Sequence, residues 1–235
     1  DSKVYIEESE IILSEIDVNL DLIKLLKREN SIKKIKIISK KNSIKNVTDF
    51  LNSYKFSLPR LVIYNQIKSG DIKATANIYY DKENSEKFNY DLIGEVIDAN
   101  IESFHNSIFN NINFKFYVRN QSFNFENIHF EYNKIKIDSE KLSIIKSGKN
   151  FAVNGDLEIK ESFLNPKIIK PIFNFDYLAD KNILVNTTNK FSFNINSNKK
   201  ITDLKYNSKL SFDKIFINPK YQDLIYLNDG IINSE

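Results

Sequence analysis

The sequence predicts a mainly β protein in which long antiparallel strands form one extended, twisted sheet with only a few short helices. Two observations carry this prediction. From residue 71 onward apolar and polar residues alternate with period two, which is typical of strands with one buried and one solvated face. Several alternating segments run for nine or ten residues, whereas ordinary strands average about five or six. A β-sandwich, with a second sheet on the apolar face, is the alternative.

The composition bounds the class of protein. The chain has 235 residues, of which 41% are hydrophobic and 28% charged, as in ordinary folded proteins. It contains 36 Ile, 32 Asn and 31 Lys but only 3 Arg, 5 Ala, 5 Gly and 4 Pro, a bias that indicates an A/T-rich genome. The 34 basic residues are therefore no sign of a nucleic-acid partner, because 31 acidic residues balance them. The absence of Cys excludes disulfides and thiolate metal sites.

We expect residues 1–235 to be one continuous piece of a larger protein, because the chain begins with Asp1 and contains no Met. Residues 1–70 form a mixed part with strands and short helices. Residues 71–235 form a meander of long strands, interrupted by a short helix near residues 165–173. No apolar run approaches the roughly 20 residues that a membrane-spanning helix needs.

The mixed part combines both periodicities. Strands are expected at Ile16–Leu20 and Ile32–Ser39, and helices after Asp21 and over Asn46–Tyr54. Asp21 is placed as the N-cap of the first helix, in which Leu22, Leu25 and Leu26 share one face.

The meander is predicted from a series of alternating segments, which are Gly70–Asp81, Lys87–Ile97, Ile112–Val118, Ser122–Ile137, Asn150–Lys160, Lys190–Asn196 and Asp203–Phe212. The first two are joined by the polar hairpin connection Asp81–Glu86. Within Ser122–Ile137 the apolar phase changes twice, which requires bulges or short turns if the apolar side is to stay inward. Gly94 and Gly155 lie inside strand patterns and predict bulges or bends.

The one helix expected in the meander begins at a capping residue. Asn165 is the cap, Pro166 takes the first helical position, and Pro171 limits the helix to about two turns.

The sequence contains no visible catalytic machinery. Its two histidines, His105 and His129, have no neighbouring cluster of metal ligands, and the five scattered glycines form no phosphate-binding loop. Asp156 and Glu158 flank Leu157 on the polar face of a strand, where solvated charges are expected. We therefore predict no enzymatic activity, no cofactor and no metal site.

The aromatic residues are the remaining signal, and they favour a half-buried sheet face over a surface that stacks bases. A nucleic-acid surface needs aromatic and basic side chains on the same face. Here Lys115 falls between Phe114 and Phe116, on the opposite face. The candidate binding residues are those of the apolar face, which are Ile72, Ala74, Ala76, Ile78, Tyr80, Phe88, Tyr90, Leu92, Val96, Ile112, Phe114, Phe116, Val118, Phe151, Val153, Leu157, Ile159, Phe191, Phe193 and Ile195.

Three segments resemble the AsmA-like family of bacterial envelope proteins. Asn42–Asp81 is similar to that family's short helix, followed by a strand and then by a glycine that opens a long alternating strand. Phe123–Ile144 is similar to its paired strands joined through Asn-Ile, and Lys149–Lys160 to its recurrent Val-x-Gly-x-Leu-x-Ile strand. With the strands around them, these segments extend the resemblance over most of residues 42–217. The family's N-terminal membrane helix is not among these residues.

The resemblance implies a sheet curled into a U-shaped groove, with an apolar inner face along which lipid acyl chains move between the inner and outer membranes. It implies a periplasmic location with an inner-membrane anchor outside this sequence. The implied partners are phospholipid or another acyl lipid and neighbouring parts of the same protein, and the candidate residues above would line the groove. The residues alone leave a structural or adhesive β-sandwich or solenoid open as the alternative, because both arrangements give the same alternation.

Overall fold

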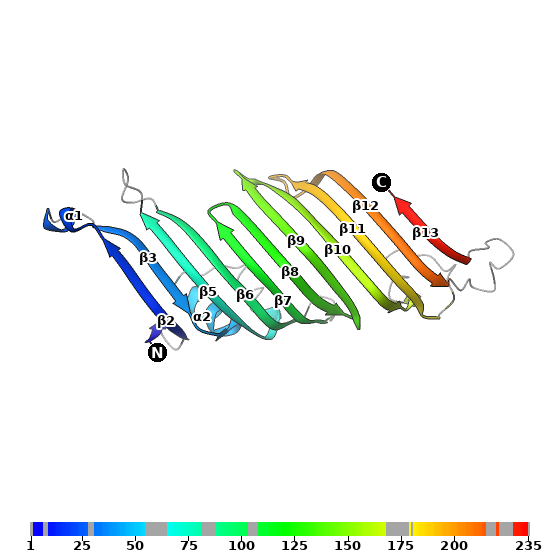
Figure 1. Cartoon of the computed structure of the whole chain (residues 1–235), viewed down its shortest axis with the longest axis horizontal. Helices are drawn as coiled ribbons and strands as arrows, with labels where there is room; N and C mark the ends of the chain where they lie inside the picture. Colours follow the sequence, from blue (N-terminus) through cyan, green and yellow to red (C-terminus); the bar gives the residue numbers. More distant parts are fainter. Residues whose placement is uncertain are drawn as a thin grey trace.

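The computed structural model describes residues 2–6, 9–27, 31–54, 65–80, 88–102, 108–167, 179, 181–214, 220 and 228–234, and these form a single open sheet (Figure 1). The strands are β1 (Ser2–Ile6), β2 (Ser9–Leu20), β3 (Ile32–Ser39), β4 (Asn42–Ser43), β5 (Ile67–Tyr80), β6 (Phe88–Glu102), β7 (Ile108–Arg119), β8 (Ser122–Tyr132), β9 (Ile135–Ser147), β10 (Asn150–Leu164), β11 (Ile183–Ile195), β12 (Ile201–Lys214) and β13 (Asn228–Ser234). The helices are α1 (Leu22–Leu26) and α2 (Ile44–Tyr54). The predicted fold class, mainly β with long antiparallel strands and few short helices, is confirmed.

The order of strands in the sheet follows the order in the chain. The strands pair antiparallel with their neighbours in the order β1, β2, β3 and then β5 to β13, and only the two-residue β4 lies off this path, paired with β5. Within the described ranges, extensive strand contacts join hydrogen-bonded neighbours only, so no second sheet covers the first. The β-sandwich alternative is therefore wrong for this part of the chain.

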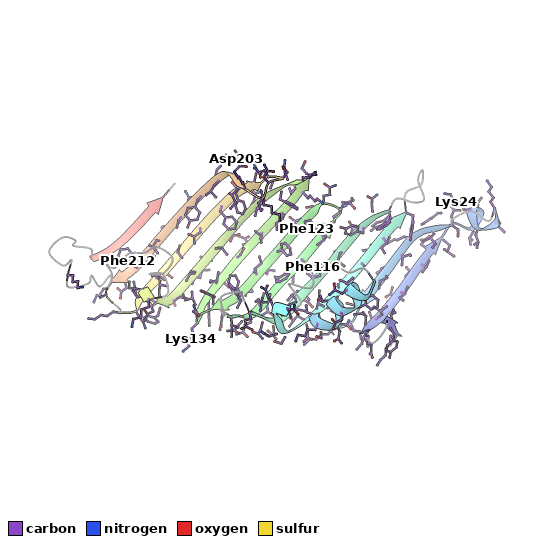
Figure 2. The ribbon with its side chains drawn as sticks, turned by 180° about the vertical axis from the view of Figure 1, so that it is seen from behind. Lys24, Phe116, Phe123, Lys134, Asp203 and Phe212 are labelled. Carbon is purple, nitrogen blue, oxygen red and sulfur yellow. The ribbon has the colours of Figure 1, made fainter. Side chains whose placement is uncertain are left out.

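The two rims of the sheet differ in what they carry. We call the rim with α1 and Asp203 the upper rim and the rim with Lys134 the lower rim (Figure 2). The helix α2 lies against the lower part of the sheet, where Ile44 packs on the buried residues Val96, Ala99 and Phe116. Asn46–Tyr54 was the predicted extent of this helix, and it begins two residues earlier, at Ile44.

Both phase changes predicted in Ser122–Ile137 have a local cause. The first is Asn127 in β8, whose φ of 52° breaks the alternation between Phe125 and Ile128. The second is a two-residue hairpin in which Asn133 and Lys134 have φ of 50° and 67°, so that Tyr132 pairs directly with Ile135. Positive φ at both central residues is the signature of a type I′ turn, the connection that matches the strand twist.

This turn gives a first test of the fold. Lys134 lacks the freedom of glycine at a positive φ, so Lys134→Gly is expected to raise the free energy of unfolding by about 0.5–1 kcal/mol. Lys136→Gly, two residues further in β9, is the matched control and should lower it by a similar amount, because glycine weakens a strand interior. Urea unfolding of both variants measures the difference. Destabilisation by Lys134→Gly would contradict the assigned turn.

Asparagine and aspartate side chains hold the irregular positions of the sheet. The Asp98 N–H donates to Asn113 Oδ1 at 3.0 Å, and the Glu161 N–H donates to Asn186 Oδ1 at 2.7 Å. Asp98 and Glu161 both have positive φ and lie where the register shifts. These amides satisfy backbone groups that a bulge removes from the ladder, so the apolar side chains keep facing one side.

The two glycines inside strands mainly allow aromatic rings of neighbouring strands to approach the backbone closely. A Cβ on Gly94 would lie 2.5 Å from Phe116 Cζ and 2.4 Å from the Lys73 carbonyl oxygen. Gly94 keeps its register with both neighbouring strands, so of the predicted bulge or bend no bulge is present there. Gly155 is the last residue in register before a shift against β9, so an irregularity at that place is confirmed.

The first helix has the predicted cap but not a buried face. Asp21 Oδ1 accepts hydrogen bonds from the N–H groups of Ile23 and Lys24, at 3.1 and 3.3 Å. The bond from Lys24 is the main reason that the pKa of Asp21 is lowered from its ordinary value. The leucines predicted to share one face do not pack on the sheet, because α1 has no buried residue.

Several predictions fall on residues outside the described ranges, namely the Asp81–Glu86 connection, His105 and most of the helix near 165–173. Of that helix the structure describes Pro166 and Lys167 as helical, and the Lys167 N–H donates to Asn165 Oδ1 at 3.0 Å, as expected for a capping residue. Among the described residues, no helix combines the length and the apolar character needed to cross a bilayer.

Candidate functional site

A continuous row of apolar residues crosses nine strands of the sheet. Cross-strand pairs link its members in the order Ile16, Ile37, Ala76, Leu92, Val118, Phe123, Ile144, Val153 and Phe193, from β2 to β11. Directly paired residues in an antiparallel ladder point to the same face, so all nine side chains share one face. At about 4.8 Å per strand, the row is roughly 38 Å long.

A second row runs beside the first and is rich in aromatic rings. It links Ala74, Gly94, Phe116, Phe125, Leu142, Gly155, Phe191 and Tyr206. The two glycines make space for the rings of Phe116 and Phe191 on adjacent strands. The Phe114 ring meets the ring of Phe125 edge to face at 5.6 Å, which extends the aromatic surface towards the lower rim.

All twenty predicted site residues lie on this apolar face, because each belongs to the alternation that the cross-strand pairs define. Val96, Phe116 and Val153 are buried, Phe88 and Leu157 are exposed, and the other fifteen are half-buried. The placement on one face is as the sequence predicted. A face of half-buried Ile, Phe and Val is unusual for a sheet whose apolar side is covered by protein.

Burial is concentrated in two clusters away from the upper rim. One cluster contains Val96, Ala99 and Phe116 on β6 and β7, and the other contains Ile183, Val185 and Phe212 on β11 and β12. Figure 2 shows Phe116 in the middle of the sheet and Phe212 towards its lower rim. Towards the upper rim Phe88, Ile201 and Tyr206 are exposed, so the apolar face is most accessible there.

A polar island interrupts the apolar face on β11 and β12. Asn189 Oδ1 accepts hydrogen bonds from Tyr206 Oη and Ser208 Oγ, both at 2.7 Å, and Asn189 Nδ2 donates to the Leu157 carbonyl oxygen at 3.2 Å. Sequence reasoning missed this island. Thr187 and Asn189 occupy odd-numbered positions of β11, as the apolar residues Val185 and Phe191 do, and this was the signal for polar residues on the apolar face. The abundance of Asn in the chain hid it.

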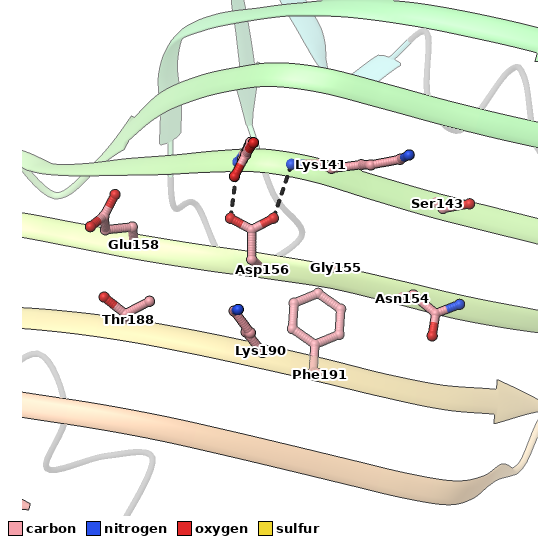
Figure 3. A pocket seen from close by; sticks show the side chains of 10 residues that line it. Lys141, Ser143, Asn154, Gly155, Asp156, Glu158, Thr188, Lys190 and Phe191 are labelled. Atoms are coloured by element: carbon pink, nitrogen blue, oxygen red, sulfur yellow. Dashed lines mark hydrogen bonds between the residues drawn. The ribbon is translucent and has the colours of Figure 1, made fainter. Parts of the chain in front are cut away.

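The opposite face is polar and contains most of the charged residues of the described strands. Two hollows lie on it, one of about 690 Å³ over β9, β10 and β11 and one of about 550 Å³ over β10, β11 and β12. In the larger one Asp156 accepts from the N–H groups of Glu140 and Lys141 at 3.0 and 2.9 Å, so its carboxylate is engaged in holding a bulge (Figure 3). Glu158 pairs with Lys160 at 2.7 Å and raises the pKa of that lysine. These hollows are open to solvent, and the charged side chains described in them take part in contacts within the sheet.

His129 is the one histidine among the described residues, and it pairs with an aspartate. His129 Nδ1 lies 2.5 Å from Asp138 Oδ1, and both side chains are exposed on the polar face between β8 and β9. Within the described ranges, no group of three His, Asp or Glu side chains is placed to hold a metal ion. The prediction that the chain is not an enzyme stays a prediction.

No protein-family model matches the chain, and the searches of curated proteins and of solved structures returned no match.

Proposed function

We propose that this chain is a non-enzymatic lipid-binding segment of a bacterial envelope protein. In this proposal acyl chains lie on the apolar face of the sheet and are shielded from water while they move between the inner and outer membranes. The observation that carries the proposal is the nine-strand apolar row, which no second sheet covers among the described residues. The envelope location, the inner-membrane anchor and the movement of lipid along the sheet come from the resemblance to the AsmA-like family.

The dimensions of the face suit acyl chains. The hydrocarbon core of a bilayer is about 30 Å thick, so one extended acyl chain needs about 15 Å. The apolar row, at roughly 38 Å, is more than twice as long. Strands of 12 to 15 residues give the face a second dimension of about 40–50 Å. Such a surface is far larger than the apolar patches of ordinary soluble proteins, which a bound lipid would explain.

The side chains of the face also suit a ligand without fixed shape. They are mostly branched aliphatic and aromatic groups, and the polar groups of the island are satisfied by one another through Asn189. A surface that buries chains through apolar area alone accepts different lipids and holds none of them at a fixed site. That property supports conduction along the sheet and argues against a site for one lipid species.

The test is lipid retention by the full chain. The protein is purified from a bacterial host without detergent, extracted with organic solvent and analysed by mass spectrometry. We expect phospholipid in the extract, and we expect a fluorescent fatty acid to bind the delipidated protein and to be displaced by phospholipid. An extract without lipid, together with no binding of the fluorescent probe, would overturn the proposal. An unrelated soluble β protein carried through the same purification gives the background.

A further inference from the structure

The helix α1 carries four large aliphatic side chains, and all of them are exposed to solvent. Leu22, Ile23, Leu25 and Leu26 are 69%, 68%, 50% and 85% exposed, and no residue of the helix is buried. Single exposed leucines are normal on a protein surface. Four within five residues form a contiguous apolar patch, which marks an interaction surface.

The helical geometry separates this patch from two lysines. At about 100° per residue, the four aliphatic side chains occupy an arc of roughly 160°. Lys24 and Lys27 fall on the remaining part of the circumference. The turn is therefore amphipathic, with aliphatic groups on one side and two ammonium groups on the other. It projects at the upper corner of the sheet, where Lys24 marks its position (Figure 2).

The patch continues onto the adjoining strand. Ile16, Val18 and Leu20 of β2 are exposed, and Ile16 and Val18 pair with Ile37 and Ile35 of β3. β1 pairs with β2 only as far as Leu13, so beyond Leu13 no described strand lies along the edge of β2 that faces away from β3. The apolar surface thus runs from the face of the sheet over its upper corner to α1.

The described charged side chains on and beside α1 are mainly positive. Among the described residues Asp21 is the acidic residue next to α1 in the chain, and its carboxylate both caps the helix and pairs with Lys33 at 3.3 Å. Its charge is therefore already neutralised. Lys24 and Lys27 have no such carboxylate among the contacts described for α1. An approaching surface would meet aliphatic groups flanked by ammonium groups.

We propose that α1 and the upper half of β2 insert into the surface of an anionic lipid bilayer. A projecting turn of Leu and Ile needs no complementary pocket in a bilayer, where each aliphatic group enters the acyl region independently. The lysines keep their charged ends at the phosphate level, with their stems along the apolar region. A protein partner would favour Trp, Tyr or Arg anchors, and α1 has none of these. This inference goes beyond the proposed function, because it concerns docking on a bilayer and not the uptake of lipid by the sheet.

The experiment is flotation of the full chain with vesicles of phosphatidylcholine alone or mixed with phosphatidylglycerol. We expect binding to the mixed vesicles, and we expect the double variant Leu22→Ser with Leu26→Ser to weaken it at least about tenfold. Leu204→Ser, at a leucine on β12 that is 64% exposed, is the control and should float like the parent protein. Lys24→Glu with Lys27→Glu should abolish the preference for anionic vesicles and its dependence on salt.

A second readout is independent of folding defects in the serine variants. The chain has no Cys, so Leu26→Cys can be labelled with an environment-sensitive fluorophore at one position. Its emission should shift to the blue when anionic vesicles are added, and the label on Leu204→Cys should not respond. Unchanged emission from the Leu26→Cys label would overturn the proposal, as would unchanged flotation of the double serine variant. The lipid that co-purifies with the chain tests the proposed function separately. Its absence would leave the flotation and fluorescence results unaffected.

Discussion

Gly94→Ala is expected to lower the free energy of unfolding by about 2–3 kcal/mol, one of the largest effects of any single methyl group in this chain. The added Cβ would lie 2.4 Å from the Lys73 carbonyl oxygen and 2.5 Å from Phe116 Cζ. The ring can turn away, but the carbonyl belongs to the β5 ladder and can move only with its strand. Urea denaturation followed by circular dichroism measures the loss.

Gly155→Ala is the matched control for this prediction. Its added Cβ would meet Phe191 Cζ at 2.8 Å and Leu142 Cδ1 at 3.0 Å, both at the ends of side chains. These ends can rotate, so the expected loss is below about 1.5 kcal/mol. Equal losses for the two variants would show that ring crowding, and not the carbonyl of Lys73, sets the requirement for glycine.

Phe193→Asp is expected to reduce the lipid retained by the purified protein about tenfold or more while leaving it folded. Phe193 is half-buried at the β11 end of the nine-strand row. Without lipid a carboxylate there reaches water at little cost, whereas with lipid it must lie against acyl chains and lose its hydration. The apolar contact area between the phenyl ring and the acyl chains is also lost, which adds to this penalty. Mass spectrometry of extracted lipid, normalised to protein, gives the ratio.

Ser192→Asp places the same charge on the preceding residue, which faces the polar side and pairs with Lys205. It should retain lipid like the parent protein. Equal loss in both variants would mean that net charge, and not the apolar face, controls retention. Unfolding by Phe193→Asp would indicate a face that protein already covers, and would count against lipid binding there.

The alternation of the sequence predicted which residues share a face but not where each strand begins. Ile112–Val118 was the predicted extent of a strand that runs over Ile108–Arg119. Asn111 has a φ of 53°, and this bulge ends the regular alternation while the strand continues. Similarly, β2 extends back to Ser9, although Ile11, Ile12 and Leu13 are consecutive apolar residues with no period of two.

The open sheet could not be predicted from alternation, because a strand with an open apolar face and a strand covered by a second sheet show the same alternation in the sequence. The difference lies in the summed geometry of many strand pairs, which decides whether distant strands meet. The polar island was hidden for another reason. Asn189 is one of 32 asparagines, and only the register with Tyr206 and Ser208 shows that its amide is a hydrogen-bonding centre and not a solvated side chain.

The agreement between strand order and chain order makes this sheet a one-dimensional array. Each hairpin interacts mainly with the hairpins before and after it, so stability accumulates as a sum of neighbour terms and unfolding can start at either end. Contacts close in sequence also favour rapid formation of each hairpin. Duplication or deletion of one hairpin, such as β7 with β8, changes the length by about 9.6 Å and preserves every other pairing. The span of such a protein can therefore evolve in steps of one hairpin, without any repeat being visible in its sequence.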